Sequence, residues 1–387
     1  MKQINFGELR IGETAKNNLL DCVNTDWASS GPKVKEFERK WGELFDYKYN
    51  KAVSSGTDAV LNLVSSLYTL GAKRGDEVIV PALSFIATSN AVLMAGFTPV
   101  FVDVELDTMN LNPAKVEAAI TDKTRAILVV HTMGRPCDMT AFNEIATRRE
   151  LYLFEDACEA HGAKILGEYI GKWSHGAAFS FYTAHLINSG EGGMVSTQVK
   201  EVADAVGCTR SHGREEGSLY FDHIMVGYNS KMNDLEASLG LEGISNFQSI
   251  FDYRRGFLLQ LIMATQKYKE FAWFSFETPE FTTCPHGFSI TLKDNRNINL
   301  LTEVLDSNKI QWKRNFGSIP TQHKAYEFMG HKVGDFPNAE YIGDFGIHIG
   351  THHYMQQEDV DRIIDVLSTY FEALQCQNEN TSQLSQS

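Results

Sequence analysis

Apolar and polar residues alternate along the first 245 residues in a way that predicts strands and helices in turn. Short, nearly continuous apolar runs predict buried strands at residues 77–81, 99–104, 126–131, 151–157 and 177–183. Helical spacing of apolar positions predicts helices at residues 34–45, 56–70, 89–94, 113–120 and 139–149. Strands of this kind alternating with helices predict an α/β fold with a mostly parallel sheet covered on both faces.

The pattern changes after a segment reading GYNSKMNDLEASLGLEG. Strand-like runs follow at residues 288–292 and 310–314, and a closing helix is expected at residues 360–374. We therefore predict a large α/β domain over residues 1–245 and a smaller α+β domain over residues 246–374. Residues 375–387 are polar and low in complexity, which predicts a disordered tail.

Composition excludes several classes of protein. The net charge is −14 with no long basic run, which argues against a nucleic-acid partner. No apolar stretch approaches the length of a membrane span or a signal peptide, so we expect a cytoplasmic protein without a membrane partner. The six cysteines are scattered and read as reduced thiols. His348, His352 and His353 have no cysteine or carboxylate at ligand spacing beside them, so no metal site is predicted.

Three places in the large domain could carry chemistry. Gly56 and Thr57 stand at the start of a predicted helix, where free N–H groups favour an anion, although a simple N-cap explains them equally. Asp156 ends an apolar strand, where open α/β sheets place ligands, although it could be a helix cap. His185 precedes the turn GEGG, which is neither a dinucleotide nor a P-loop fingerprint. Taken alone, this histidine could be structural.

Seven motifs occur in a fixed order over residues 25–245. They read SSGTDAV, EVIVPALSFIATSNAV, PVFVDVELDTMNL, TRAILVVHTMGRPCDM, FEDACEAHGA, FSFYTAH…GEGG and GYNSKMNDLEASLG. Together they resemble the DegT/DnrJ/EryC1/StrS sugar aminotransferase family. The resemblance implies fold type I, like aspartate aminotransferase, and a homodimer whose active sites are shared between subunits. It also implies pyridoxal or pyridoxamine 5′-phosphate as cofactor.

The resemblance assigns cofactor-binding roles residue by residue. Gly56 and Thr57 match the phosphate-binding turn, and Ser180 matches a serine close to the phosphate. Phe85 matches the side chain that stacks on the pyridine ring, and Asp156 matches the partner of the ring nitrogen. Two further positions belong to the set, Glu159, where many members have glutamine, and Asn229, which in the family reaches the neighbouring subunit's phosphate.

His185 departs from the family's pattern, because the aligned residue in ordinary members is the Schiff-base lysine. A histidine there resembles the dehydratase branch, of the GDP-4-keto-6-deoxy-D-mannose 3-dehydratase type. The segment GIHIGTHH at residues 346–353 resembles the same branch. Some members of that branch carry an iron–sulfur cluster on clustered cysteines, which this sequence lacks.

The substitution changes the expected chemistry. Imidazole forms no stable Schiff base but is a good general base near neutral pH. The resemblance therefore implies a noncovalently held cofactor and His185 as the catalytic base of a 3-dehydratase. The expected substrate is a nucleotide-linked 4-keto-6-deoxy sugar, with glutamate as amino donor. The alternatives are a sugar aminotransferase that tolerates His185, a lysine variant engineered for trapping, and a catalytically silent binding protein.

Overall fold

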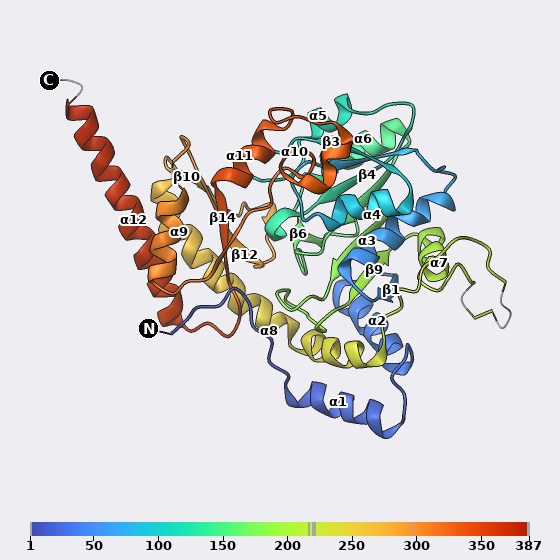
Figure 1. Ribbon diagram of the computed structural model, residues 1–387. Helices are drawn as coiled ribbons and strands as arrows, with labels where there is room; N and C mark the ends of the chain where they lie inside the picture. Colours follow the sequence, from blue (N-terminus) through green and yellow to red (C-terminus); the bar gives the residue numbers. More distant parts are fainter. Residues whose placement is uncertain (1, 216, 219–221, 297, 385–387) are drawn as a thin grey trace.

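A seven-stranded sheet forms the centre of the chain (Figure 1). The structure is a computed structural model that describes residues 2–215, 217–218, 222–296 and 298–384. The strands lie in the order β1 (Tyr49–Val53), β9 (Gly193–Thr197), β8 (Gly176–Ser180), β5 (Tyr152–Asp156), β4 (Thr124–Val130), β2 (Glu77–Pro81) and β3 (Thr98–Val102). The pairs from β8 to β3 are parallel, whereas β9 is antiparallel to both of its neighbours. The predicted α/β fold with a mostly parallel sheet is therefore confirmed.

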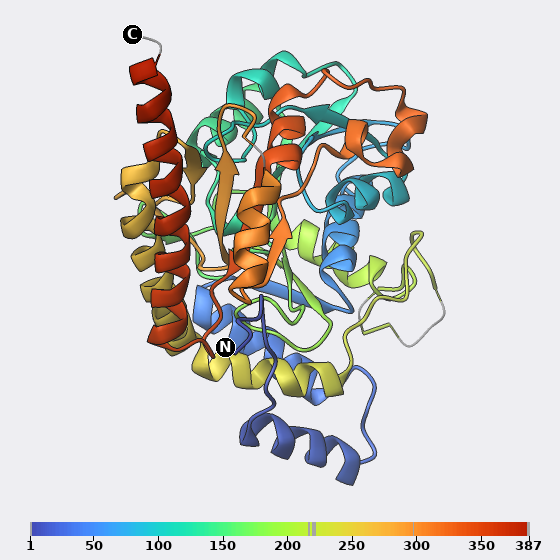
Figure 2. The ribbon, with the colours of Figure 1, turned by 60° about the vertical axis from the view of Figure 1, so that its left-hand side comes forward.

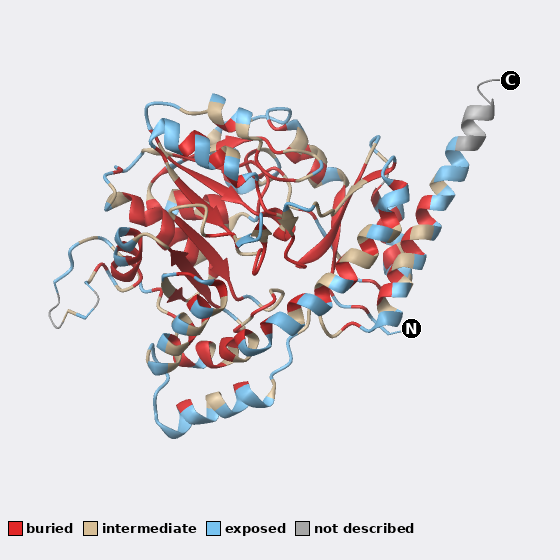
Figure 3. Ribbon diagram, turned by 180° about the vertical axis from the view of Figure 1, so that it is seen from behind, coloured by how far each residue is buried: buried red, intermediate tan, exposed pale blue. Residues whose placement is uncertain are grey.

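The alternation of side chains along the strands builds two separate cores. On β2, Val78 and Val80 belong to one buried cluster, and Ile79 between them belongs to the other. Successive strand side chains point to opposite faces, so both faces must be covered by helices. One face packs against α2 (Pro32–Phe45), α6 (Met139–Arg149) and α8 (Asp234–Thr265), and the other against α3 (Gly56–Ser65), α4 (Ala87–Ala95) and α7 (Lys200–Thr209). Figure 3 shows the buried sheet between helices whose outer faces are exposed.

The remaining elements of the large domain lie around this sandwich. Helix α1 (Glu13–Asn24) packs beside α8, at the bottom of Figure 2. Helix α5 (Pro113–Ala118) packs on α6. A small sheet joins β6 (Lys164–Ile165) to β7 (Glu168–Tyr169) and β11 (Phe281–Thr282). Across both domains, short 3₁₀ turns occupy Ser66–Tyr68, Thr132–Gly134, Gln266–Tyr268 and Lys324–Met329.

A four-stranded antiparallel sheet forms the centre of the smaller α+β domain. Its order is β10 (Ala272–Phe274), β12 (Gly287–Leu292), β14 (Gly346–Gly350) and β13 (Trp312–Arg314). It shares a third core with α9 (Ile298–Ser307) and α12 (Gln357–Leu384). Ile4 also belongs to this core and pairs with Ile310, so the first residues of the chain pack on the smaller domain.

The boundary predicted at residue 245 falls inside α8, which continues without a break to Thr265. The chain also returns to the large domain late in the sequence. Helices α10 (Ile319–Gln322) and α11 (Pro337–Phe345) place Ile319 and Ile342 in the core that covers β2. The two ranges predicted from composition are thus interleaved in space, because a contact between distant segments leaves no mark on local composition.

The expected disorder of the C-terminal tail requires a correction. Residues 375–384 continue α12, which extends past the body of the molecule in Figure 1, and residues 385–387 lie outside the described residues. Once the packed part of a helix has formed, each added residue gains a backbone hydrogen bond without a new nucleus, so a polar segment can continue it. Among the described helices, none is long and apolar enough to cross a membrane.

Candidate active site

The candidate site lies at the carboxyl edge of the parallel strands. Asp156 is the last residue of β5, Ser180 is the last residue of β8, and these two strands are neighbours in the sheet. Helix α3 begins at Gly56, directly after β1, and brings its N-terminus to the same edge. The structure therefore brings together three of the regions that the sequence singled out. This is the place where open α/β sheets bind ligands.

The N-terminus of α3 forms a cradle that only glycine fits. A Cβ added at Gly56 would lie 2.5 Å from Cβ of Ser180 and 3.3 Å from Sγ of Cys158. Ser55 is the N-cap, and its hydroxyl accepts a 3.0 Å hydrogen bond from the N–H of Asp58. The first N–H groups of a helix have no intrahelical acceptor. Those of Gly56 and Thr57 are therefore free to bind a ligand beyond the N-terminus of α3. With the helix dipole they favour an anion such as a phosphate.

Asp156 is held in place by a residue that the sequence analysis did not identify. Its carboxylate is 7% exposed and accepts a 2.7 Å hydrogen bond from Oγ1 of Thr88, in the first turn of α4. The N–H of Cys158 donates to its other oxygen at 3.3 Å. Thr88 follows Phe85 by three residues in the stretch SFIAT, which was the available signal for its position. Asp156 is therefore a buried carboxyl group, held in a fixed orientation, that could bind a protonated ring nitrogen.

His185 lies in a turn between β8 and β9, and its N–H donates to the carbonyl of Tyr182 at 2.9 Å. Its Nδ1 is buried and makes no hydrogen bond to any described residue. Burial, together with the positive charges of Arg254 and Lys313, lowers the pKa of His185 to about 3. The imidazole is therefore neutral at neutral pH, with a lower proton affinity than a free imidazole.

Glu159 is a carboxylate in an environment that disfavours its charge. It accepts a 2.7 Å hydrogen bond from the N–H of Met133, and its other oxygen lies 3.4 Å from Nε2 of His286. Burial raises the pKa of Glu159 to about 7, against the lowering effect of the Met133 hydrogen bond. His286, just before β12, was also not identified from the sequence. It brings the smaller domain to the edge of the site.

Phe85 and Asn229 lie at the periphery of these residues. The Phe85 side chain is 61% exposed, and its ring centroid is 6.1 Å from that of Phe316. Asn229 is exposed, and its side-chain oxygen accepts a 3.2 Å hydrogen bond from Nζ of Lys231. An exposed asparagine is available to a neighbouring subunit, but its predicted role in that subunit's site stays a prediction.

Among the histidines near the C-terminus, His348 has a local partner, whereas Nε2 of His352 and Nδ1 of His353 are buried without a hydrogen bond to the described residues. Nδ1 of His348 is 3.0 Å from Oδ1 of Asn315, and the ring packs edge-on against Phe6. Burial lowers the pKa of His348 to about 3. In the part of the chain that the structure describes, no group of histidine, cysteine and carboxylate side chains is arranged to hold a metal ion.

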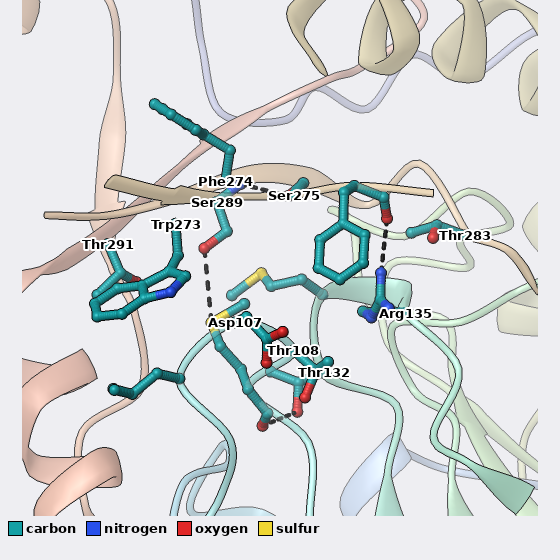
Figure 4. Close-up of a pocket in the computed structure, with 14 residues that line it drawn as sticks. Asp107, Thr108, Thr132, Arg135, Trp273, Phe274, Ser275, Thr283, Ser289 and Thr291 are labelled. Carbon is teal, nitrogen blue, oxygen red and sulfur yellow. Dashed lines mark hydrogen bonds between the residues drawn. The ribbon is translucent and has the colours of Figure 1, made fainter. Parts of the chain in front are cut away.

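A pocket lies between the two domains, next to the candidate active site (Figure 4). Residues 106–109 and the turn Thr132–Gly134 face strands β10 and β12 across it. Arg135 spans the gap, because its guanidinium donates to the carbonyl of Phe276 at 2.8 Å and lies 3.5 Å from the centre of that ring. Met133 belongs both to this pocket and to the active site, where its N–H donates to Glu159.

The residues present fit a pyridoxal-type cofactor. The cradle at Gly56 accepts a phosphate, Asp156 is placed for a ring nitrogen, and Phe85 offers an exposed aromatic face. The buried, unpartnered Nδ1 of His185 leaves the imidazole free to exchange protons. These contacts do not depend on a covalent link to a lysine.

Comparisons with known proteins identify the family of the chain. The model of the DegT/DnrJ/EryC1/StrS aminotransferase family matches residues 9–368. The chain is 36% identical to the GDP-perosamine synthase of Escherichia coli O157:H7, over 66% of this chain and 69% of the relative. It is 27% identical to the GDP-4-keto-6-deoxy-D-mannose 3-dehydratase of Yersinia pseudotuberculosis, over 92% of this chain and 95% of the relative. The solved E. coli GDP-4-keto-6-deoxy-D-mannose-3-dehydratase with bound hydrated PLP is 25% identical, with a TM-score of 0.86 and coverage of 95% of this chain and 100% of that chain.

Proposed function

Because the chain belongs to the DegT/DnrJ/EryC1/StrS aminotransferase family, we propose that it is a 3-dehydratase of a nucleotide-linked 4-keto-6-deoxy sugar. The observation that carries this proposal is His185, which stands where the family's resemblance places the Schiff-base lysine. The relatives include both dehydratases and amino-sugar-forming enzymes, so the choice between the two activities rests on this residue.

The chain's own residues would hold the cofactor without a covalent bond. The N-terminus of α3 and Ser180 would bind the phosphate, and Asp156 would keep the ring nitrogen protonated. When bound, pyridoxamine phosphate supplies the amine that joins the sugar ketone, an electron-withdrawing ring, and the two electrons by which the C3 hydroxyl is replaced with hydrogen. Glutamate is the proposed donor that restores the amine.

His185 would act as the general base. Its neutral imidazole accepts at a ring nitrogen the proton whose removal drives loss of the C3 hydroxyl. A lysine at this position could also bond covalently to the cofactor and displace an amino-sugar product from it, whereas the imidazole can only bind and release protons. The expected product is therefore a 3-deoxy-4-keto sugar with ammonia, instead of a stable amino sugar.

Mass spectrometry of the products tests this proposal. The protein is incubated with glutamate, pyridoxal phosphate and GDP-, CDP-, UDP- or dTDP-linked 4-keto-6-deoxyhexoses. A product that lacks the C3 oxygen, formed with release of ammonia, supports the dehydratase. A 4-amino sugar that keeps its C3 hydroxyl supports the aminotransferase, and no turnover with any substrate supports the silent binding protein.

A substitution at position 185 tests the role of the histidine. His185→Asn should retain the cofactor but lower the rate of dehydration by about 10²–10⁴-fold, the usual contribution of general-base catalysis. His331→Asn is the control, since His331 lies at the surface beside Asp335. Dehydration by His185→Asn at the wild-type rate would contradict the mechanism.

A further inference from the structure

Three ionisable side chains from separate segments form a line through the interior of the site. His185 lies in the turn after β8, His286 precedes β12 in the smaller domain, and Glu159 follows β5. The rings of His185 and His286 have centroids 5.2 Å apart and are tilted by 35°. Nε2 of His286 is then 3.4 Å from Oε1 of Glu159. The line therefore runs from the candidate base to a carboxylate through one intervening imidazole.

The two imidazoles each have one nitrogen without a partner. Nδ1 of His185 and Nδ1 of His286 are both buried and make no hydrogen bond to the described residues. A buried polar atom without a partner costs about 1–3 kcal/mol. The two rings do not bond to each other directly, and one water between them would satisfy both atoms. Such a water would make the line continuous for a proton.

Arg254 fixes the two segments that carry these rings. It extends from α8, is 2% exposed, and donates to the carbonyls of Pro285 and His286 at 3.0 Å each. Its Nη1 also lies 3.5 Å from the carbonyl of Ala184, the residue before His185. One buried guanidinium thus holds the turn of the large domain and the segment of the smaller domain in a fixed relation.

We propose that His286 and Glu159 form a proton relay that serves His185, with His286 as a positioning residue between them. This inference rests on the proposed function of His185 as a base. When His185 takes up a proton at one ring nitrogen, it releases the proton on Nδ1 to one bridging water, which passes a proton to Nδ1 of His286. His286 in turn releases its Nε2 proton to the carboxylate of Glu159. Each imidazole gains one proton and loses one, and Glu159 stores the proton until it is returned to the leaving hydroxyl.

The electrostatics of the three groups suit this task. Burial lowers the pKa of His286 well below its ordinary value, as it does for His185, so both rings are neutral and can accept at one nitrogen while donating from the other. The pKa of Glu159, about 7, lets its carboxyl group gain and lose a proton near neutral pH. Other titratable or charged groups that face the three side chains are Asp156, His161, Tyr182, Arg254, Cys284, Lys313 and His348.

Glu159→Gln and His286→Gln test the relay by two measurements. Both variants keep a polar side chain of similar size, and glutamine at position 159 can still accept the Met133 hydrogen bond. With saturating cofactor, kcat for dehydration should fall by about 10–100-fold while KM for the sugar changes little, because a relay acts on proton transfer and not on binding. The inflection of kcat near pH 7 should disappear in Glu159→Gln. His348→Gln is the matched control, a buried histidine outside the line, and should keep that inflection.

The second measurement does not depend on turnover. In ¹⁵N-histidine spectra of the protein without cofactor, the His286 nitrogens should change shift near pH 7 in the wild type and not in Glu159→Gln. If the wild type shows neither the kcat inflection near pH 7 nor the change in the His286 ¹⁵N shifts, while its sugar product still lacks the C3 oxygen, the relay alone would be overturned. An amino-sugar product from the wild type would overturn the proposed function, and the spectra would still decide whether Glu159 and His286 exchange a proton. Wild-type kcat and an unchanged pH profile in both variants would contradict the inference.

Discussion

The hydroxyl of Thr88 donates a 2.7 Å hydrogen bond to Oδ2 of Asp156, joining the first turn of α4 to the end of β5. Thr88 is 1% exposed, so water cannot replace the bond. Thr88→Val removes the donor at nearly constant volume. A hydrogen bond to a charged group is worth about 1.5–3 kcal/mol, so we expect pyridoxal phosphate to bind about 10- to 150-fold more weakly. Absorbance titration of the apoprotein measures this affinity. Thr98→Val, at an exposed position of β3, should bind as the wild type does.

Gly56 should tolerate no side chain. In Gly56→Ala the new methyl group would lie 2.5 Å from Cβ of Ser180, so the start of α3 or the end of β8 must shift. Overpacking of this kind costs about 1–3 kcal/mol, and we expect cofactor affinity to fall about 10- to 100-fold. Gly256→Ala is the matched control, because nothing lies within 4 Å of its added Cβ on helix α8. That control should stabilise the protein by up to about 1 kcal/mol. Equal affinity in both variants would mean that the phosphate binds elsewhere.

The cofactor should not be bound covalently to any lysine of the wild-type protein. Borohydride treatment of the pyridoxal-loaded protein, followed by peptide mass spectrometry, should find no pyridoxyl-lysine in the site. Lys313 is the lysine to examine, because its charge acts on both His185 and Glu159. His185→Lys is the positive control and should yield a modified peptide at position 185. A specific modification of wild-type Lys313 would show that this enzyme has moved its covalent lysine to β13.

The active sites should be shared between the subunits of a homodimer. If Asn229 serves the neighbouring site, Asn229→Ala and His185→Ala impair different parts of the same composite site. A mixed dimer then contains one intact site. Random subunit exchange between equal amounts should therefore give about a quarter of the wild-type activity, because half of the dimers are mixed. Each variant mixed with itself is the control. Activity that stays at the level of the separate variants, after exchange is verified, would contradict shared sites.

Glu159 should make the stability of the apoprotein depend on pH in a specific direction. Its pKa in the folded state, about 7, lies above the ordinary value of 4.5, so the folded protein binds more protons than the unfolded chain between these values. The stabilising effect of the protonated carboxyl is present at low pH and is lost as pH rises through 7. Relative to Glu159→Gln, the wild type should lose about 3 kcal/mol between pH 4.5 and 7. Urea denaturation at several pH values measures this difference, and a constant difference would refute the raised pKa.

The local elements could be predicted because their causes are local. Residues 139–149 have helical spacing, and the structure has α6 at Met139–Arg149. The run EVIVP is β2, with every residue but Glu77 buried. By contrast, β9 reads GMVST and has no strong strand pattern of its own. It forms because β1 and β8 pair with it on both sides.

The sequence by itself determined the alternating elements, the parallel centre of the sheet and the position of Asp156 at the end of its strand, whereas it placed Ser180 inside a strand that the structure ends at that residue. Periodicity and motif order fix these features, since both are written in neighbouring residues. Only the tertiary structure placed Thr88 on Asp156, His286 beside Glu159, and the Arg254 guanidinium across both segments. Thr88 and Asp156 are 68 residues apart, His286 and Glu159 are 127 apart, and Arg254 is about 30 and 70 residues from the two segments that it joins. Contacts over such separations depend on how the elements pack in three dimensions, which no local pattern of residues encodes.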